Sequence, residues 1–427
     1  MEKSAAPTSG DRSYKAIIIG AGPAGLFAAI RLAQAVRCDI IVLEGSEKPA
    51  RKLLASGSGQ CNISHAGPIA DFLSRYGGGE KAQSAARFLK PALYGFDNRA
   101  LLDWFGARGV EFEIEENGKI FPADRRASSI LKVLQGEARK TDIVIETKSR
   151  VRAVGHGPEG FTVHVEGREE PYRAPLLLLA TGGITYPKTG SSGDGYAFAA
   201  SLGHHILPPR PALAPVYIRD FSLEPLAGHS FREARLAVLR AGKRIAEKRG
   251  DLLITHQGFS GPVILDSSRN IMPGDFLEIS FLPESIDEFR NRLDAELQAK
   301  PRRLVRLCLP ELGLTKNMAE LFCELARIPG ESTAANLPRA GRDALSRLAC
   351  AHSFQVAGLG SLDIAMVTAG GVDLAEVNSQ TMESRLVPGL FFAGEILDFD
   401  GDTGGYNLQA AFSTGALAAS SVGKRIS

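Results

Sequence analysis

Cysteine is scarce in this sequence. The 427 residues include five cysteines, which are scattered along the chain and form no Cys-x-x-Cys motif. An odd and dispersed set of cysteines argues against a disulfide framework, a zinc site or an iron–sulfur cluster. We therefore expect no metal, and a protein that works in a reducing, cytoplasmic compartment.

Long apolar runs are also absent. No uninterrupted run of Leu, Ile and Val is longer than the four residues of Leu176–Leu179, whereas a membrane-spanning helix needs about 20 apolar residues. Residues 1–13 are polar and lack the apolar segment of a signal peptide. We expect a disordered tail over residues 1–13 and no membrane partner.

A dominant charge of one sign is missing too. Lys and Arg number 50 against 48 Asp and Glu, which gives a formal net charge of +2. So small an excess gives no electrostatic reason to expect nucleic acid as a partner. The composition, 44% hydrophobic and 23% charged, is that of a soluble globular protein, and the length predicts two or three domains.

The most informative stretch is residues 16–44. An apolar β-branched run predicts a buried strand, and it is followed directly by Gly20-x-Gly22-x-x-Gly25 and a helix rich in Ala and Leu. A second apolar run, 40–43, ends at the acid Glu44. Strand, glycines, helix, strand and acid therefore occur in register within one unit.

Each part of this stretch has a physical role in dinucleotide binding. Gly20 permits a tight turn, Gly22 lets a pyrophosphate approach the backbone, and Gly25 lets helix and strand pack closely. The helix N-terminus offers unpaired N–H groups to the pyrophosphate. Glu44 lies near the spacing of roughly 20 residues at which an acid binds ribose hydroxyls, which favours FAD or NAD over NADP.

A second glycine-rich loop follows at residues 56–62. Its small residues and side-chain donors are typical of a loop that wraps a ligand. Arg51 and Lys52, just before it, are candidates to neutralise a diphosphate, and the alternative is a solvated charge pair beside a flexible loop.

The pattern changes along the chain and predicts a split domain. Glycine-rich loops of the kind that bind ligands occur over residues 14–204 and again over 352–427. The first range includes the buried strand 176–179, which stops at Ala180, Thr181 and Gly182. Short strands and turns predict an inserted β-rich module over 205–284 and 326–351, interrupted by a helical insertion over 285–325. The fold class expected is α/β, a split Rossmann-like domain with an inserted β-rich module and helical subdomain.

With these motifs placed, the chain resembles the FAD-dependent two-dinucleotide-fold flavoproteins, and more narrowly the BaiN/YhiN-type family of NAD(P)/FAD-dependent, aminoacetone-oxidase-like proteins. The matching blocks are GAGPAGL, RKLLASGSGQCN, LLITHQGFSGPVILDSS, ATGGITYPKTGSSGDGYAFA and the long block from VTAGG to AFSTG. They cover nearly the whole chain. Gln60 departs from the basic residue usual in the second block, and Thr185 from the usual Ser.

The resemblance implies noncovalently bound FAD and names the residues that would hold it. The first glycine block would bind the pyrophosphate and Glu44 the adenosine ribose, while Val151 would reach the adenine. The remaining contacts would come from the second loop, the strand end and the C-terminal block. The implied cofactor-binding residues are Gly20, Gly22, Pro23, Ala24, Gly25, Glu44, Arg51, Lys52, Ser56, Gly57, Gly59, Gln60, Cys61, Asn62, Val151, Ala180, Thr181, Gly182, Gly394, Glu395, Gly404, Gly405, Tyr406, Asn407 and Leu408.

Three functions stay open at this point. The first is an NAD(P)H-linked reductase in which reduced FAD passes hydride to an activated C=C bond of an enone-type small molecule. The second is an oxidase of an amine or amino ketone that uses oxygen, and the third is a non-catalytic FAD-binding redox sensor. No second Gly-x-Gly-x-x-Gly follows Glu44, so NAD(P)H would act as a transient donor at the flavin.

Candidate proton donors are few. His256 has an imidazole suited to proton transfer near neutrality, although a histidine that shapes its loop is at least as common. Tyr186 and Tyr406 are candidates to donate protons or to stack on the flavin, and packing alone explains either about half the time. A helix that begins near Tyr406 would also direct its positive dipole at the flavin.

Overall fold

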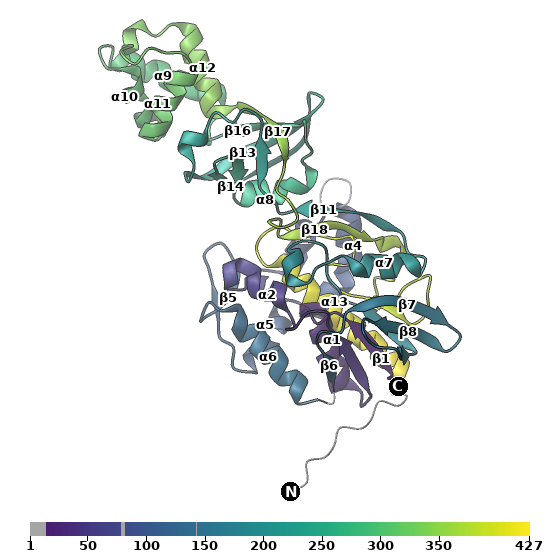
Figure 1. The fold of residues 1–427 in the computed structure, drawn as a ribbon. Coiled ribbons are helices and arrows are strands. Elements are labelled where there is room, and N and C mark those ends of the chain that lie inside the picture. The colour runs from purple at the N-terminus through teal and green to yellow at the C-terminus, as the bar shows by residue number, and fades with distance from the viewer. Residues whose placement is uncertain (1–13, 78–81, 142) are drawn as a thin grey trace. The chain divides into compact units, whose positions relative to one another are not determined.

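This computed structural model describes residues 14–77, 82–141 and 143–427, so the tail expected over 1–13 lies outside the described residues. The chain forms two compact units. Unit 1 comprises the chain up to Pro211 together with Leu362–Ser427, and unit 2 is Ala212–Ser361. Each unit has its own hydrophobic core and is described by itself (Figure 1).

A parallel sheet forms the centre of unit 1. Its strand order is β19-β10-β1-β2-β6. Every residue of β1, β2 and β10 is buried, as uninterrupted apolar runs predict for strands covered on both faces. Register places Ile17 beside Leu177 on one side and Ile41 on the other. The strands are β1 (Ala16–Ile19), β2 (Ile40–Leu43), β6 (Val144–Glu146), β10 (Leu176–Leu179) and β19 (Leu390–Phe392).

Two helices, α1 (Pro23–Ala35) and α13 (Tyr406–Ile426), pack against each other in unit 1. Their contact depends on small residues, because a Cβ added at Gly415 would lie 2.6 Å from the carbonyl oxygen of Ala24. The start of α1 is therefore packed closely against α13. The other α-helices described in unit 1 are α2 (Arg51–Ala55), α3 (Ile69–Phe72), α4 (Ala82–Gly95), α5 (Asn98–Gly106), α6 (Ala127–Arg139) and α7 (Asp194–Ser201).

Smaller sheets complete unit 1. An antiparallel hairpin is formed by β4 and β5, and β5 also pairs with β3. A separate antiparallel sheet follows the order β7-β8-β9, and β11 pairs with β18. These strands are β3 (Ser64–His65), β4 (Phe112–Ile114), β5 (Lys119–Pro122), β7 (Val151–Gly157), β8 (Gly160–Val165), β9 (Tyr172–Ala174), β11 (Ile206–Ala212) and β18 (Val367–Val372).

Unit 2 contains a closed barrel, and its helices lie in the sequence between barrel strands. The strand order is β12-β15-β14-β13-β16-β17. Its strands are β12 (Val216–Ile218), β13 (Ser230–Arg240), β14 (Lys243–Ile254), β15 (Gly258–Ser260), β16 (Phe276–Ser280) and β17 (His352–Leu359). Its helices are α8 (Pro262–Ser267), α9 (Ile286–Ala299), α10 (Val305–Cys308), α11 (Lys316–Leu325) and α12 (Arg339–Cys350). The α/β fold class with a β-rich module is confirmed.

The limits of the inserted unit differ from those expected. Residues 205–211 stay with unit 1 because β11 pairs with β18. Residues 352–361 belong to unit 2 because β17 pairs with β12 and β16 and closes the barrel. The helical region is also longer than 285–325, since α12 lies within the stretch assigned to the β-rich module and packs against α9.

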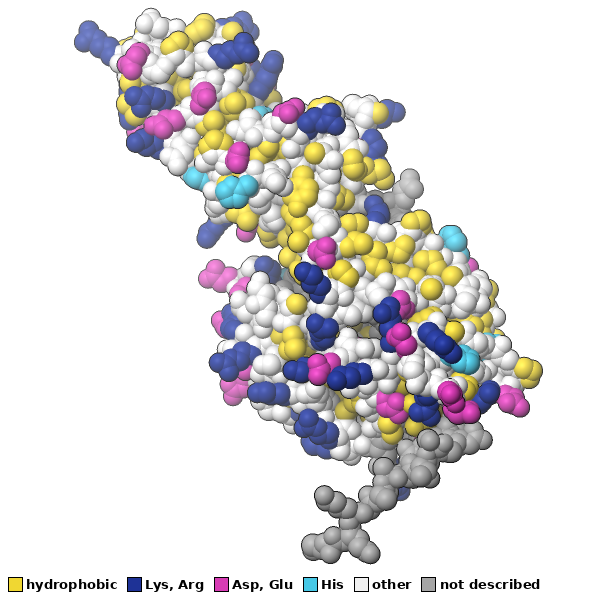
Figure 2. Space-filling view, in the orientation of Figure 1, with side chains coloured by type: hydrophobic (Ala, Val, Ile, Leu, Met, Phe, Trp, Pro, Cys, Tyr) yellow, Lys and Arg dark blue, Asp and Glu magenta, His cyan; other side chains and the backbone are white. Residues whose placement is uncertain are grey.

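Charge is mixed on the surface of both units. The face drawn in Figure 2 carries Lys and Arg side chains with Asp and Glu between them, so no single sign covers a unit there. Across the described residues, no helix is both long and apolar enough to cross a membrane.

Candidate active site

The three glycines after β1 have different surroundings. Gly20 has a φ of +103°, and a Cβ there would lie 2.5 Å from the carbonyl oxygen of Ala180. A Cβ on Gly25 would lie 2.0 Å from the carbonyl oxygen of Gly20. A Cβ on Gly22 would meet no protein atom within 4 Å. Gly20 and Gly25 therefore serve the fold, whereas Gly22 leaves open space in front of the backbone.

Helix α1 begins at this open space. Gly22 is its N-cap, Pro23 occupies the first turn, and no side chain caps the helix. Pro23 lacks an N–H, so the unpaired N–H groups start at Ala24. The uncapped end and its positive dipole are suited to a pyrophosphate, and the chain therefore fits a dinucleotide at this position.

Glu44 is held beside the glycine loop. Its two carboxylate oxygens accept from Ala21 N at 2.9 Å and Ser46 N at 2.8 Å. The backbone carbonyl of Glu44 accepts from Ser149 N at 2.9 Å, which brings the segment before Val151 next to this acid. Val151 itself is buried at the start of β7. The two residues expected at the adenosine end therefore lie on joined segments.

The second loop adopts an irregular backbone. Gly57 and Ser58 have left-handed φ values of 56° within the short turn Ser56–Gly59, and Cys61 has a φ of 61°. Gln60 accepts from Arg125 at 3.4 Å. Burial raises the pKa of the Cys61 thiol to about 12, so this cysteine stays protonated and is no nucleophile at neutral pH.

Asn62 joins the second loop to the start of α13. Its amide, oriented so that both ends are satisfied, donates to the carbonyl oxygens of Ser64 at 2.9 Å and Ile120 at 3.2 Å. Its oxygen then accepts from Gly405 N at 3.2 Å. Two motifs far apart in sequence, expected at one cofactor, are therefore in contact.

Lys52 contacts an acid that the sequence placed in a different motif. Its ammonium nitrogen lies 2.7 and 2.8 Å from the carboxylate oxygens of Glu395 and 2.7 Å from the Thr185 hydroxyl. Glu395 also accepts from Thr368 N at 2.8 Å. Lys52 was expected to neutralise a diphosphate together with Arg51, which is exposed. In the structure Lys52 links α2 with the loop after β10 and the loop after β19, and through Glu395 with β18.

The N-terminus of α13 also lacks a side-chain cap. Gly405 is its N-cap with a φ of 93°, and no side chain caps the helix. A Cβ on Gly405 would lie 2.4 Å from the carbonyl oxygen of Ser64. Asn407 accepts from Gly401 N at 2.7 Å and donates to Gly401 O at 2.9 Å, so its side chain holds the preceding loop. Gly404, also left-handed, and half-buried Leu408 flank this end.

An aromatic cluster that sequence reasoning missed surrounds Tyr406. The Tyr406 ring stacks on His65, with centroids 5.1 Å apart and planes 16° apart, and meets Phe72 edge-on at 5.0 Å. The Tyr76 hydroxyl donates to the carbonyl oxygen of Tyr406 at 2.8 Å. Burial raises the pKa of Tyr76 well above its ordinary value. His65 and Tyr76 lie outside every recognisable motif, so no local signal marked them.

The ends of β10 and β19 complete the site. Ala180 N donates to Ile19 O at 2.9 Å and Gly394 N to the Thr414 hydroxyl at 3.0 Å. Gly182 has a φ of +75° with open space around its Cβ position. The Thr181 hydroxyl is buried and has no hydrogen-bond partner among the described residues. These strand ends lie where nucleotide-binding sheets hold their ligands.

The three candidate proton donors are in different surroundings. Tyr186 is half-buried with a left-handed φ of 53°, and it follows Thr185, the partner of Lys52. Tyr406 is buried in the aromatic cluster. His256 is exposed in the turn between β14 and β15 of unit 2, whereas Tyr186 and Tyr406 belong to unit 1.

This site and sheet define the class of dinucleotide-binding oxidoreductases. The chain belongs to the family described as HI0933-like protein Rossmann domain, whose model matches residues 14–421. The resemblance to BaiN/YhiN-type proteins is thereby confirmed, and the chain is an FAD-dependent oxidoreductase.

Several known proteins resemble the whole chain. It is 32% identical to the 3-dehydro-bile acid delta(4,6)-reductase of Clostridium scindens, over 96% of this chain and 98% of that protein. It is 33% identical to the ribosomal RNA dihydrouridine synthase of Escherichia coli, over 94% and 96%. Among solved structures, a 3-ketosteroid-delta4-(5alpha)-dehydrogenase from Rhodococcus jostii shares the fold, with a TM-score of 0.51, 17% identity and coverage of 97% and 98%.

Proposed function

We propose that this protein reduces a C=C bond conjugated to a carbonyl group, with NAD(P)H as the electron donor. One observation carries the proposal. Two relatives of similar identity over nearly the whole chain are named for different substrates, yet both names describe saturation of such a bond. A Δ4 bond in a 3-dehydro steroid is conjugated to the ketone, and the double bond lost in dihydrouridine is conjugated to a ring carbonyl.

The reaction balances with a hydride and a proton. The carbon β to the carbonyl gains the hydride, the α carbon gains the proton, and NAD(P)H supplies both electrons. Bound FAD supplies the hydride-transfer chemistry between donor and acceptor. The protein must bind the cofactor, hold the acceptor and deliver the proton.

We assign cofactor binding and proton delivery to residues of unit 1. The uncapped start of α1 and Glu44 hold the pyrophosphate and the ribose. The uncapped start of α13 favours negative charge placed before it. Tyr186 supplies the proton, because it is half-buried and its neighbour Thr185 is bonded to the Lys52–Glu395 pair. Tyr406 is a less suitable donor, since its ring is buried between His65 and Phe72.

Anaerobic flavin bleaching tests the proposal. The purified protein is mixed separately with NADH and NADPH at millimolar concentration, and the flavin absorbance is followed. We expect one nicotinamide to bleach the flavin and a 4-en-3-one steroid or a uridine-containing RNA to restore its colour. Bleaching by neither nicotinamide would overturn the proposal and direct the search to amine donors, with peroxide as the product to detect.

A further inference from the structure

The β4–β5 hairpin supports the cofactor site although none of its residues belongs to a predicted cofactor motif. The carbonyl oxygen of Ile120 in β5 accepts from the Asn62 amide at 3.2 Å. At the tip of the hairpin, the carbonyl oxygen of Gly118 accepts from Ala66 N at 2.7 Å. The hairpin therefore holds, from outside, the segment that joins the second glycine-rich loop to the start of α13.

His65 lies between the tip of this hairpin and the start of α13. Its ring nitrogens Nδ1 and Nε2 lie 2.8 Å from Ala66 O and 3.0 Å from Asn117 O. The ring is stacked on that of Tyr406, with planes 16° apart. Its Cδ2 lies 3.3 Å from the position that a Cβ on Gly404 would take. One side chain thus contacts the hairpin, the first residue of α13 and the glycine loop before it.

The His65 ring has room only because residue 118 is a glycine. A Cβ at this position would lie 2.3 Å from Cε1 and 2.8 Å from Nε2 of His65. Gly118 also has a left-handed φ of +83°, which glycine adopts at no steric cost. The turn explains the φ, but the close approach of the ring is a second requirement. The space left at position 118 therefore fixes where the His65 ring lies.

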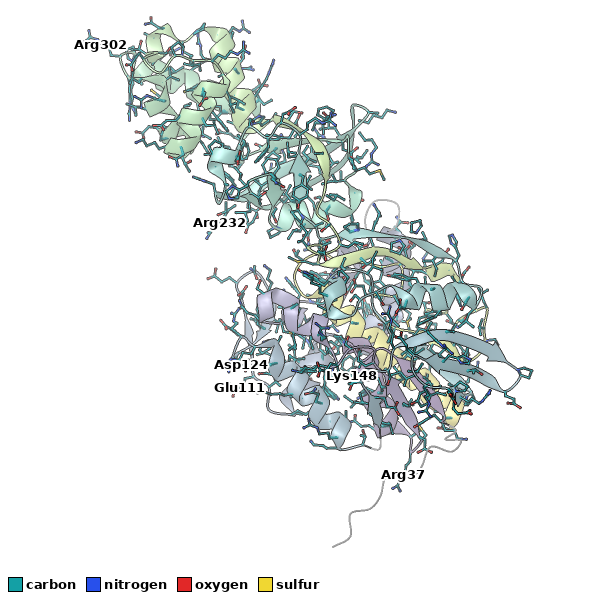
Figure 3. All side chains as sticks on the ribbon, viewed as in Figure 1. Arg37, Glu111, Asp124, Lys148, Arg232 and Arg302 are labelled. Carbon is teal, nitrogen blue, oxygen red and sulfur yellow. The ribbon has the colours of Figure 1, made fainter. Side chains whose placement is uncertain are left out.

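The tip of the hairpin lies at the surface of unit 1. Glu111 and Asp124, which flank the hairpin, are exposed and lie at the margin of the unit (Figure 3). Asn117 at the tip is exposed as well. The three heavy atoms nearest to a Cβ at position 118 all belong to His65. A methyl group at the tip would therefore meet the His65 ring before any atom of the core.

We propose that His65 is a positioning residue, which the hairpin tip holds against Tyr406 and which thereby places the start of α13 at the flavin. The start of α13 offers unpaired N–H groups and a positive dipole, and these stabilise the negative charge that reduction adds to the flavin. Displacement of the His65 ring moves the Tyr406 ring stacked on it and weakens that stabilisation. The inference rests on the proposed function only in placing the start of α13 at the flavin.

Alanine substitution at Gly118 tests this inference with a matched control. G118A and G167A each add a methyl group to a left-handed turn glycine, with φ of +83° and +73°. A Cβ at position 167 meets no protein atom within 4 Å, so the two variants share the backbone cost and differ in the clash with His65. For each full-length protein with bound FAD, the flavin midpoint potential is measured against a redox dye, without nicotinamide or acceptor.

We expect G118A to lower the preference for reduced over oxidised flavin at least about threefold, which for a two-electron couple is a fall of about 15 mV in the midpoint potential. G167A should keep the wild-type potential. An equal fall in G118A and G167A would overturn the proposal, because it would trace the effect to the turn backbone.

Variants of His65 separate a specific effect from a general one. In H65A the added methyl group has no ring to displace, so H65A and H65A/G118A should share one potential, below that of wild type. A wild-type potential in H65A, or the same fall on adding G118A with and without the ring, would refute the positioning role. If G118A does not retain FAD, the comparison of H65A with wild type decides. Failure of NAD(P)H to bleach the flavin is a separate result that concerns the proposed reductase, because the potential is measured without nicotinamide.

Discussion

At the scale of single residues, the site separates positions that serve the fold from positions that serve a ligand. The three glycines of the first motif look equivalent in sequence but are not equivalent in space. Gly25 is pressed against a carbonyl oxygen, whereas Gly22 faces open space. Alanine at position 25 is therefore expected to impair folding, whereas alanine at position 22 is expected to impair ligand binding.

We expect G22A to fold and G25A to be damaged before any ligand is added. An alanine N-cap at position 22 lowers the free energy of unfolding by at most about 1 kcal/mol, but its methyl group occupies the space assigned to the pyrophosphate. FAD affinity, measured by flavin fluorescence quenching, should fall at least about tenfold. A G22A protein with wild-type FAD affinity would contradict placement of the pyrophosphate at this helix end.

Tyr186 is the residue for which a proton-transfer role makes a specific kinetic prediction. Y186F should slow acceptor reduction by about 100-fold or more, in the range seen when a general acid is removed, while flavin bleaching by NAD(P)H keeps its rate. Stopped-flow measurement of the two half-reactions separates these effects. Y406F serves as the comparison, and a larger loss in its oxidative half-reaction would transfer the role to Tyr406.

At the scale of elements, local patterns were predictable and long-range contacts were not. The β1–α1–β2 unit follows from about thirty consecutive residues, because strand, glycine turn and helix signals are read from near neighbours. The Lys52–Glu395 pair joins residues 343 positions apart. The stack of His65 on Tyr406 likewise joins residues that are far apart in the sequence. Short strands predicted a β-rich module, but closure of the barrel depends on β17, which lies beyond a helical insertion.

The net charge of +2 also concealed an element-scale feature. Expecting no nucleic-acid partner relied on an average over the chain, and that average hides the β13–β14 hairpin, whose residues 230–254 carry a net charge of +4.

The Lys52–Glu395 pair is expected to fix four elements around the cofactor. K52M leaves the Glu395 carboxylate with Thr368 N and the Thr185 hydroxyl, which lies 3.4 Å away, as its described donors. We expect the free energy of unfolding to fall by about 1–2 kcal/mol, since both side chains are partly exposed, and FAD to dissociate about tenfold faster. K52R should restore part of the retention, and K132M, on exposed α6 surface, is the control. Unchanged FAD retention in K52M would show that the Lys52–Glu395 pair does not hold these elements around the cofactor.

At the scale of the whole molecule, each unit contains a histidine that couples its stability to pH, buried in unit 1 and half-buried in unit 2. In unit 2, burial lowers the pKa of His352 to about 4. In unit 1, His204 lies 2.9 Å from Glu376 and 2.8 Å from the Ser384 hydroxyl. Burial lowers the pKa of His204 although Glu376 opposes the shift. Both folded units therefore favour the neutral ring.

This arrangement sets the sign of the pH dependence. An unfolded histidine takes up its proton near pH 6.5, whereas His352 in the folded barrel does so near pH 4. Between these values the unfolded chain binds more protons, so its stability falls as the pH falls from about 6.5 toward 4. The histidine contribution to stability is fully present above pH 6.5.

Substitution of His352 tests this coupling at the level of the intact chain. H352F keeps an aromatic ring against Phe354, whose centroid lies 4.1 Å from that of His352, and removes the titrating group. The slope of unfolding free energy against pH between 4 and 6.5 should decrease by up to about 1.4 kcal/mol per pH unit. Urea unfolding followed by circular dichroism over this range measures it, with H156F, which removes an exposed histidine, as the control. Equal slopes in H352F and wild type would mean that the acid sensitivity arises from the carboxylates and not from the His352 ring.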